Sequence, residues 1–504
     1  MPGTFEYDFS TTGGEFKGKS SFSTGLFING EFVDSKSGKT LDVINPVNGE
    51  VVGKVSAGDK EDVDIAVKAA EKAHQTVWGE NVSGQERGKI LIKVAELIEE
   101  NADELAALET LDNGKAYSIA RSFDIMEAAA TFRYYGGWAD KDGGKVIDVN
   151  PHKLAYTIHQ SIGVVGQIIP WNFPFLMMAW KLAPALCTGN CTVLKPSEFT
   201  PLTSLRVCSI LKDAGIPDGV VNIIQGYGQT VGAAISEHPE IRKVAFTGSG
   251  PVGRMVMKAA AASNLKTVTL ELGGKSPNII FDDADLEQAV RWSAFGIFLN
   301  HGQACCAGSR VFVHEKIYDQ FKEQFLAHVK KLKVGNPFEA DTFQGPQISQ
   351  LQYDRIMGYI DAGKTEGATC DLGGERFGDS GYFIQPTVFS NTRPDMKIVK
   401  EEIFGPVVVL IKFSSTEEVV QMANDTEFGL ASAVFSRDIS KALITANKIH
   451  AGTVWVNCYN QLHNNVPFGG FKQSGIGREL GEYALANYTE VKSIHVNLTG
   501  PPPI

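Results

Sequence analysis

The chain has few cysteines, no excess of positive charge and no spacing typical of a metal site. Seven cysteines occur among 504 residues, without a CxxC pair or a Cys/His pattern that would suit zinc. A disulfide-rich secreted fold and a bound metal are therefore not expected, whereas a reduced, cytoplasmic chain is. The net charge of −11 disfavours a nucleic acid or an anionic membrane as partner, because both require a basic surface.

A targeting peptide and a membrane span are not expected either. The first twenty residues hold acidic residues, no arginine and no apolar run, which disfavours a signal or transit peptide, although the mitochondrial matrix stays open. Residues 162–180 carry no charge and are about long enough to cross a bilayer. They also contain Pro170, Asn172 and Pro174, and prolines break a helix while amides are costly in lipid. We expect a buried strand that leads into a loop.

Length and composition indicate a globular protein of two domains. Hydrophobic residues make up 43% of the chain and charged residues 21%, which is ordinary for such a protein. The chain is too long for one core, since single cores stop growing near about 250–300 residues. The region from about residue 25 to 140 is predicted to hold a hairpin at 26–46, long helices such as 86–111 and a Gly-rich break at 134–145.

Short β-branched runs alternate with helical stretches through most of the remaining chain. The first series of expected strands lies at 163–170, 191–197, 219–226, 243–249 and 266–274, with helices such as 200–215 and 252–261 between them. The second series lies at 278–283, 310–315, 387–390, 406–413 and 452–457. A repeat of about 25–30 residues is the size of a βα unit, so an α/β fold with two doubly wound open-sheet domains is predicted.

The alternation also predicts where the domains begin and end. The first domain is expected to comprise residues 1–140 and 162–273, and the second residues 274–473. The stretches 141–161 and 486–504 alternate like strands outside both patterns. They predict a small β arm, and the simplest use of such an arm is contact between subunits.

A glycine pattern follows one of the expected strands. In "KVAFTGSGPVGR" a strand runs into Gly248-x-Gly250-x-x-Gly253 and then a helix, an arrangement that admits a pyrophosphate at the helix N-terminus. The glycines could equally serve only the turn. The pattern also comes late in the series, whereas the usual dinucleotide fingerprint follows the first strand.

Three polar residues stand at expected strand ends. Lys195 and Glu198 follow the strand in "TVLKPSE", where an acid can bind ribose hydroxyls and repel a 2′-phosphate, or simply form a surface ion pair. Asn172 in "PWNFP" could donate to an oxyanion, although asparagine beside proline is commonly a turn former. Glu271 ends an apolar strand, so its carboxylate is either paired or poised as a base with a raised pKa.

The stretch "NHGQACCAGSR" places Cys305 and Cys306 side by side in a Gly/Ala-rich turn. A small, accessible thiol near backbone N–H groups suits a nucleophile, whereas a buried cysteine commonly fills a core. A disulfide between neighbours requires a strained ring. His301 raises the possibility of a Cys–His hydrolase, but a catalytic histidine normally comes from elsewhere in the chain.

The motifs resemble, as an ordered set, those of the NAD(P)-dependent aldehyde dehydrogenase superfamily. The set is "PWNFP", "KPSE", "FTGS", "LELGGKSP", "GQACCAGSR", "EEIFGPV" and "PFGGFKQSGIGRELGE", and the resemblance extends from about residue 26 to 496. "GTVWVNCY" and "WKLAPAL" look most like the tetrameric class that acts on acetaldehyde and other simple aldehydes. The resemblance implies that the first domain binds NAD, the second is catalytic, and the arm joins subunits into a homotetramer, a dimer of dimers.

The resemblance also implies the site. The family signature places the nucleophile after Gly-Gln-any residue, which selects Cys305, with Glu271 as general base. Asn172 and the Cys305 backbone N–H form the oxyanion hole, and Lys181 and Glu479 match a proton relay. Cofactor binding is implied for Ile168, Pro170, Trp171, Lys195, Glu198, Gly228, Phe246, Thr247, Gly248, Ser249, Gly253, Leu272, Gln352, Arg355, Glu402 and Phe404. The substrate tunnel is lined by Phe173, Met177, Trp180, Leu299 and Phe468.

The implied reaction is NAD-dependent oxidation of an aldehyde to a carboxylic acid through a Cys305 thiohemiacetal and thioester. Two features depart from the family, Leu299 where many relatives carry an aromatic residue and the stretch 460–466, so the size of the substrate stays open. A thiol hydrolase or acyl transferase remains as a rival, distinguished by the absence of NADH formation. A binding protein with a dead site is a second rival, against which the intact Cys305, Glu271, Asn172 and Lys195 argue.

Overall fold

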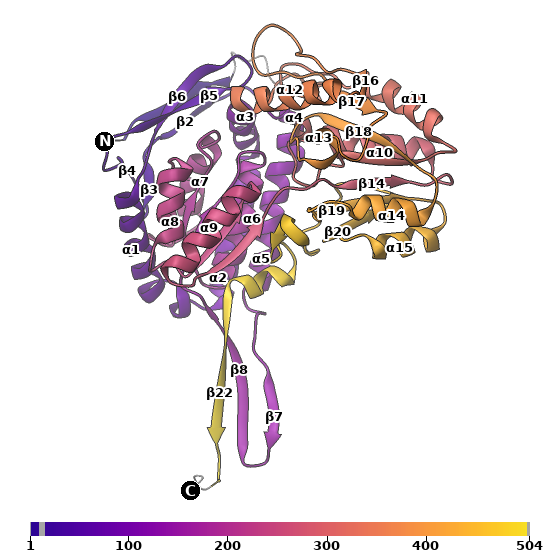
Figure 1. The fold of residues 1–504 in the computed structure, drawn as a ribbon. Coiled ribbons are helices and arrows are strands. Elements are labelled where there is room, and N and C mark those ends of the chain that lie inside the picture. The colour runs from indigo at the N-terminus through magenta and orange to yellow at the C-terminus, as the bar shows by residue number, and fades with distance from the viewer. Residues whose placement is uncertain (1, 10–15, 501–504) are drawn as a thin grey trace.

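A large sheet with strand order β21-β13-β12-β9-β10-β11-β3-β4 forms one half of the body (Figure 1). The structure is a computed structural model that describes residues 2–9 and 16–500. The strands are β3 (Leu26–Ile28), β4 (Glu31–Val33), β9 (Val164–Ile168), β10 (Cys191–Lys195), β11 (Val221–Ile223), β12 (Lys243–Thr247), β13 (Thr267–Glu271) and β21 (Gly475–Ile476). β9 to β13 are parallel, and the strand order reverses at β9. The carboxyl ends of β9 and β12 therefore lie at the switch point where such sheets bind ligands.

Helices cover both faces of this sheet, which explains why β9, β10 and β12 are buried along their whole length. They are α1 (Lys60–Thr76), α2 (Gly84–Glu100), α3 (Ala102–Asn113), α4 (Tyr117–Ile119), α5 (Met126–Trp138), α6 (Pro174–Cys187), α7 (Leu202–Asp213), α8 (Ala233–Glu237) and α9 (Gly250–Ser263). Three shorter helical segments accompany them, η2 (Gly79–Asn81), η3 (Ala120–Ile125) and η4 (Gly228–Gly232).

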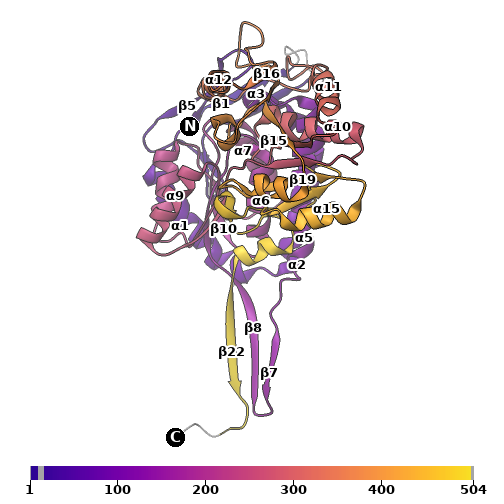
Figure 2. The ribbon, with the colours of Figure 1, turned by 45° about the vertical axis from the view of Figure 1, so that its right-hand side comes forward.

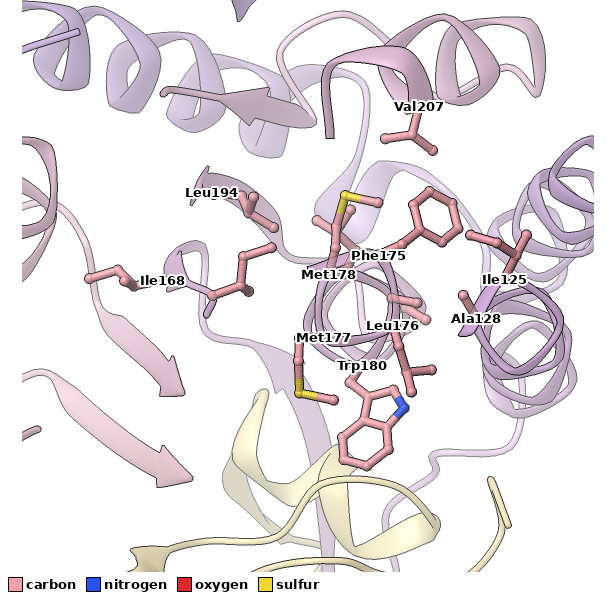
Figure 3. Close-up of a cluster of buried hydrophobic side chains, with 14 of the residues drawn as sticks. Ile125, Ala128, Ile168, Phe175, Leu176, Met177, Met178, Trp180, Leu194 and Val207 are labelled. Carbon is pink, nitrogen blue, oxygen red and sulfur yellow. The ribbon is translucent and has the colours of Figure 1, made fainter. Parts of the chain in front are cut away.

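Helix α6 is the most deeply buried of these helices, with every residue from Pro174 to Cys187 inside the protein. Seen nearly end-on, it projects side chains toward Leu194 on the sheet side and toward Ile125 and Ala128 on the other (Figure 3). The uncharged stretch 162–180 is thus divided between β9, a loop and this helix. The expected strand and loop are present, but Pro174 starts the helix, because proline fits its first turn.

The second large sheet has strand order β16-β17-β18-β15-β14-β19-β20. Its strands are β14 (Pro277–Ile280), β15 (Arg310–His314), β16 (Thr369–Leu372), β17 (Thr387–Ser390), β18 (Val407–Phe413), β19 (Ala431–Phe435) and β20 (Thr453–Val456). The helices are α10 (Leu286–Phe298), α11 (Tyr318–Val329), α12 (Gln350–Thr365), α13 (Lys397–Lys400), α14 (Thr416–Asn424) and α15 (Ile439–Lys448), with η5 (Leu299–Gly302), η6 (Lys472–Ser474) and η7 (Glu482–Asn487). The predicted α/β class with two wound sheets is confirmed.

A slender antiparallel sheet projects from the body in both views (Figures 1 and 2). It consists of β7 (Val146–Asn150), β8 (Lys153–Ser161) and β22 (Thr489–Asn497), in the order β22-β8-β7. β22 pairs with β8 over nine residues, so segments more than 300 positions apart form one ribbon. The β arm expected from the sequence is therefore present.

Three predictions about local structure were wrong or incomplete. The expected hairpin at 26–46 is two hairpins, because β3 pairs with β4 while β5 (Thr40–Asn45) pairs with β6 (Glu50–Ser56). β16 and β19 were not predicted. A further hairpin, β1 (Thr4–Asp8) with β2 (Lys19–Ser23), lies in the amino-terminal region where no element was expected.

The Gly-rich segment at 134–145 was expected to interrupt the helical region, but its first residues are helical, because α5 continues to Trp138. Gly88 of α2 faces Gly136 of α5 so closely that a Cβ on Gly88 would lie 2.6 Å from the Gly136 carbonyl oxygen. The glycines therefore permit a close helix crossing. Within residues 2–9 and 16–500, no helix is long and apolar enough to cross a membrane.

Candidate active site

A cavity lies where the two large sheets meet. The carboxyl edge of the first sheet contributes the segments that follow β9, β12 and β13. The second sheet contributes the segments that precede β15 and β18 and the segment that follows β20. Its lining includes these predicted residues: Pro170, Trp171, Asn172, Phe173, Met177, Trp180, Thr247, Gly248, Ser249, Glu271, Leu272, Leu299, Cys305, Gln352, Arg355, Glu402, Phe404 and Phe468. Residues far apart in the sequence are thus brought to one chamber.

The two neighbouring cysteines have different surroundings. Cys305 is partly exposed to the cavity, whereas Cys306 is buried and donates a hydrogen bond from Sγ to Asn460 Oδ1 at 3.3 Å. Both are free thiols. The Tyr459 hydroxyl donates to the Cys306 carbonyl oxygen at 2.8 Å and so fixes the turn from behind. Cys305 is therefore the thiol that a ligand in the cavity can reach.

The Cys305 thiol is protonated in this environment. A hydrogen bond with the Cys306 side chain raises its pKa well above the ordinary value, and burial and the nearby Glu271 and Glu402 carboxylates act in the same direction. A thiolate must therefore be produced by transfer of the proton to a base or by a positive charge brought nearby.

Asn172 is held by a lattice of asparagine amides. Its Nδ2 donates to the Gln303 carbonyl oxygen at 2.9 Å, and Asn300 Nδ2 donates to the carbonyl oxygens of Asn172 at 2.9 Å and Gln303 at 3.1 Å. Asn113 Nδ2 donates to the Trp171 carbonyl oxygen at 2.6 Å. These bonds fix the loop after β9 against the turn that carries Cys305. One N–H of Asn172 remains for a ligand, since the amide has two.

A cluster of buried charged side chains also supports the loop between β9 and α6. Lys115 Nζ lies 3.0 Å from Glu109 Oε1 and 2.6 Å from Asp124 Oδ1, and all three side chains are fully buried. Burial raises the pKa of Asp124 to about 8. Glu109 also accepts from the Phe175 backbone N–H at 3.4 Å, and Lys115 Nζ lies 4.2 Å from the centre of the Phe173 ring. The cluster therefore braces the start of α6.

Glu271, the last residue of β13, is a buried carboxylate without a hydrogen-bond donor among the described residues. Burial raises its pKa well above the ordinary value, and the nearby Glu479 raises it further, while Lys181 and Arg478 oppose the shift. Lys181 Nζ and Glu479 Oε1 form a buried ion pair at 2.5 Å. The three side chains form a connected acid–base group.

The end of β12 forms a cradle for a dinucleotide. A Cβ on Gly248 would lie 2.6 Å from the Phe246 ring, and one on Gly253 would lie 2.9 Å from Leu272, so a side chain at either position would have to displace its neighbour. Ser249 directly precedes the fourteen-residue helix α9, and its side chain does not cap the helix, which leaves backbone N–H groups at the helix N-terminus for an anion.

The neighbouring strand ends supply polar groups. Lys195 pairs in register with Ile168, and its Nζ donates to Glu198 Oε2 at 3.1 Å. Burial lowers the pKa of Lys195 against the opposing effect of Glu198. Gly228 begins η4, and a Cβ there would meet open space. The predicted ion pair thus lies beside the end of β9, with the Glu198 side chain 30% exposed.

The second sheet closes the cavity from the opposite side. Glu402 Oε1 accepts from the Gly274 backbone N–H at 2.9 Å, and burial raises the Glu402 pKa to about 7. Arg355 donates to the Glu402 carbonyl oxygen at 2.9 Å, and Gln352 donates to the Phe404 carbonyl oxygen at 2.8 Å. Phe404 meets the Trp171 ring edge-on at 5.3 Å. Glu402, Gln352, Arg355 and Phe404 therefore gather around one part of the cavity.

The remaining wall is mostly apolar. Trp180 and Phe468 pack edge-to-face at 5.7 Å, and Met177 and Trp180 project from the same helix (Figure 3). Leu299 lies on this wall as predicted. The sequence did not single out Phe123 or Leu176 as lining residues, and no local motif marks them. Asn460 and Leu462 belong to the stretch 460–466 that departs from the family pattern, and both line the cavity.

His301 does not act as the partner of a cysteine nucleophile. It is fully buried, it is absent from the cavity lining, and burial lowers its pKa to about 3. It stays neutral at physiological pH. The Cys–His hydrolase interpretation is therefore not supported by the geometry.

The cavity thus holds an accessible thiol (Cys305), a buried carboxylate (Glu271) and an amide (Asn172), and it lies at the switch point of a wound sheet. This arrangement is typical of an enzyme that uses a cysteine next to a bound dinucleotide. A profile described as the aldehyde dehydrogenase family matches residues 32–494. The chain belongs to the aldehyde dehydrogenase family, as the sequence motifs indicated.

Several known proteins are similar over nearly the whole chain. Aldehyde dehydrogenase of Agaricus bisporus is 60% identical over 498 residues, which is 99% of each chain. The mitochondrial aldehyde dehydrogenase of Homo sapiens is 54% identical over 479 residues, covering 95% of this chain and 92% of its own. A structure of the NAD⁺ complex of aldehyde dehydrogenase from Bacillus cereus matches with a TM-score of 0.93 at 50% identity, covering 94% of this chain and 97% of that chain.

Proposed function

We propose that this NAD-dependent aldehyde dehydrogenase oxidises acetaldehyde and related aliphatic aldehydes through Cys305, with Glu271 as general base and Asn172 in the oxyanion hole. The observation that carries the proposal is that Cys305 is reachable from a cavity that also holds Glu271 and Asn172. The apolar wall around Trp180 and Phe468 suits an alkyl chain. A panel of short, long-chain, aromatic and betaine-type aldehydes, assayed for NADH formation with NAD and with NADP, tests it.

The first half of the reaction takes place on sulfur. The Cys305 thiolate attacks the aldehyde carbon, and the carbonyl oxygen becomes the oxyanion of a thiohemiacetal. The free N–H of Asn172 and the Cys305 backbone N–H stabilise that oxyanion. Because the thiol is protonated at rest, its proton must leave first, and Glu271 is the buried base that can receive it, directly or through water.

The cofactor sites fit NAD. The cradle around Gly248 and Gly253, the uncapped start of α9 and the pair Lys195–Glu198 offer small residues, N–H donors and a ribose acceptor. Bound NAD supplies the acceptor for the hydride that leaves the thiohemiacetal carbon. Glu402 and Phe404 would hold the nicotinamide end, and Gln352 and Arg355 fix their backbone.

The second half releases the acid. After oxidation the acyl group is held as a thioester on Cys305. Once Glu271 has released the proton it took from the thiol, its carboxylate removes a proton from water so that hydroxide attacks the acyl carbon. The proton then has a buried route through Glu479 and Lys181, whose ion pair lies next to Glu271. The thiolate is expelled and the carboxylic acid departs.

Replacement of Asn172 by alanine is expected to reduce kcat with acetaldehyde about 10²- to 10³-fold, because one oxyanion donor is lost. The KM for NAD should change little. Steady-state kinetics at saturating NAD measure both. Asn48→Ala is the matched control, since Asn48 is an exposed asparagine that does not line the cavity. An Asn172→Ala enzyme with an unchanged kcat would remove Asn172 from the oxyanion hole.

Replacement of Glu198 by glutamine is expected to raise the ratio of kcat/KM with NADP to that with NAD on the order of tenfold, because a carboxylate beside the ribose repels a 2′-phosphate. Initial rates with each dinucleotide give the ratio. Glu417→Gln, an exposed position on α14, serves as the control for a change of net charge. If both variants keep the original ratio, Glu198 does not select the cofactor.

We further propose that the chain forms a homotetramer, a dimer of dimers, through its projecting arm. The arm exposes apolar side chains such as Val146 (79% exposed) and Val491 (67%), and an isolated three-stranded ribbon is poorly stable without a partner. Val146→Asp with Val491→Asp is expected to lower the molar mass measured by light scattering. Leu265→Asp, an exposed apolar residue on the body, should leave the mass unchanged. A tetramer that survives the arm variant would place the contact elsewhere.

The predicted domain division and location stay proposals as well. We assign residues 1–140 and 162–273 to NAD binding, 274–473 to catalysis and 141–161 with 486–504 to the arm, following the two large sheets and the ribbon. A cytoplasmic location, with the mitochondrial matrix as the alternative, is supported by seven free cysteines, since reducing compartments keep thiols unpaired.

A further inference from the structure

One polar group in the substrate end of the cavity has no role in the reaction as described. The wall there is built mainly from Leu176, Met177, Trp180, Leu299, Leu462 and Phe468. Asn460 belongs to the same wall and is only 7% exposed. A buried amide among apolar side chains is costly unless its hydrogen bonds are made, so its presence requires an explanation.

Half of the Asn460 amide is satisfied by the protein. Its Oδ1 accepts from Cys306 Sγ at 3.3 Å, whereas its Nδ2 is buried and meets no acceptor among the described residues. Asn457 offers a direct comparison, since both asparagines have a positive φ, 57° and 53°. The Asn457 amide donates to the Ser436 carbonyl oxygen and accepts from the Ser436 N–H, each at 3.0 Å. Local structure accounts for Asn457 and leaves the Asn460 donor free.

The segment around Asn460 is tied down on both sides. The Tyr459 hydroxyl donates to the Cys306 carbonyl oxygen at 2.8 Å, and Trp455 Nε1 donates to the Gln461 carbonyl oxygen at 2.8 Å. The Asn460 amide is therefore held in the cavity wall. The Cys306 thiol, by donating to Oδ1, fixes the orientation of the amide so that Nδ2 is the atom left without a partner in the described part of the chain.

Asn460 Nδ2, the free donor, is connected to the proposed nucleophile Cys305 through a single residue, Cys306. Cys306 follows Cys305 directly, and its thiol contacts both the Cys305 thiol and the Asn460 amide. An acceptor that meets Nδ2 must therefore lie within the first few atoms of the substrate beside its carbonyl carbon. An alkyl aldehyde offers no such atom, whereas an oxygen on the second or third carbon does.

We propose that Asn460, oriented by Cys306, selects aldehydes that carry an oxygen acceptor on the second or third carbon by donating Nδ2–H to that oxygen. This inference rests on the proposed function, since it requires the aldehyde carbon at Cys305. Asn460 touches the substrate and determines specificity, while Cys306 is a positioning residue that acts through Asn460.

The test compares methoxyacetaldehyde with butanal, which have the same number of heavy atoms. The ether oxygen accepts a hydrogen bond and cannot donate one. The measured quantity is the ratio of kcat/KM for the two aldehydes, monitored as NADH formation, in the wild type and in each variant. The intrinsic reactivity and hydration of the aldehydes cancel when these ratios are compared between enzymes.

Asn460→Gly and Asn460→Asp remove the donor and tolerate the positive φ. Each is expected to lower the ratio about fivefold, the effect of one hydrogen bond. Cys306→Ala should lower it by a smaller factor, and Cys306→Ser should restore it, since a hydroxyl still donates to Oδ1. Leu462→Ala widens the same wall and is expected to leave the ratio unchanged.

The outcomes separate the inference from the proposed function. Normal acetaldehyde turnover with an unchanged ratio in both Asn460 variants would show that Asn460 serves only the backbone, and overturns the inference. A ratio that falls equally in Leu462→Ala would assign the effect to tunnel width and overturn it too. Loss of acetaldehyde turnover in both Asn460 variants would make Asn460 a support for the nucleophile instead. Absence of NADH from any aldehyde in the wild type would contradict the proposed function itself.

Discussion

Replacement of Cys305 by alanine is expected to lower kcat for acetaldehyde on the order of 10⁴-fold or more, because the covalent intermediate can no longer form. The measurement is NADH formation at saturating aldehyde and NAD. Mass spectrometry of the wild-type enzyme, quenched during turnover, should find the acyl group on the peptide that contains Cys305. The same peptide from the variant should carry no adduct.

Cys306→Ala is the matched control, since it removes a thiol one position away. Cys306 is buried and bonded to Asn460, so most of the turnover of acetaldehyde, which lacks a second oxygen, should remain. The assignment of the nucleophile would be wrong if Cys305→Ala kept full activity or if the acyl group were found on Cys306.

Replacement of Glu271 by glutamine is expected to lower the steady-state kcat on the order of 10²- to 10⁴-fold, the usual contribution of a general base. Rapid-mixing experiments should then show a burst of NADH before the slow phase, because the thioester accumulates when water is no longer activated. In the wild type, kcat should rise with pH as Glu271 ionises. Its raised pKa places that rise well above the range of an ordinary carboxylate, and the variant should lose it.

Glu402→Gln provides the control for Glu271, because it makes the same substitution at another carboxylate that lines the cavity and has a raised pKa. It is expected to raise the KM for NAD and to produce no burst. A Glu271→Gln enzyme with a normal kcat and an unchanged pH profile would transfer the role of base to another group.

The sequence predicted the wound sheets, and a cysteine that the cavity exposes, for identifiable reasons. Parallel strands such as β9 and β10 are buried along their whole length and contain the β-branched residues expected of a strand, and their spacing matches one βα unit. β19, in contrast, reads ASAVF, and its small residues lack the β-branched pattern that marks its neighbours. Pro174 was interpreted as a helix breaker, but in the structure it is the first residue of α6. Proline both interrupts a helix and fits its first turn, and sequence alone does not separate these two uses.

The supporting residues of the site could not be predicted from local patterns. Asn113, Asn300 and Asn172 lie in three separate segments, and only the folded chain reveals that their amides donate to the backbone carbonyls of Trp171, Asn172 and Gln303. The charge cluster of Lys115, Glu109 and Asp124 looks in sequence like an ordinary solvated helix face, yet it is entirely buried. Long-range packing, which has no signature at short spacing, decides both.

The division of the proposed catalytic groups between the two sheets has a consequence for how such a molecule can be altered. Glu271 and Asn172 stand at strand ends of one sheet, and Cys305 stands on a turn that precedes a strand of the other. Neither half possesses a working reaction centre alone. We therefore expect the activity of a chimera, made by joining one half to the corresponding half of a relative, to depend on how well the two halves pack against each other. This should hold even where both parent enzymes are fully active.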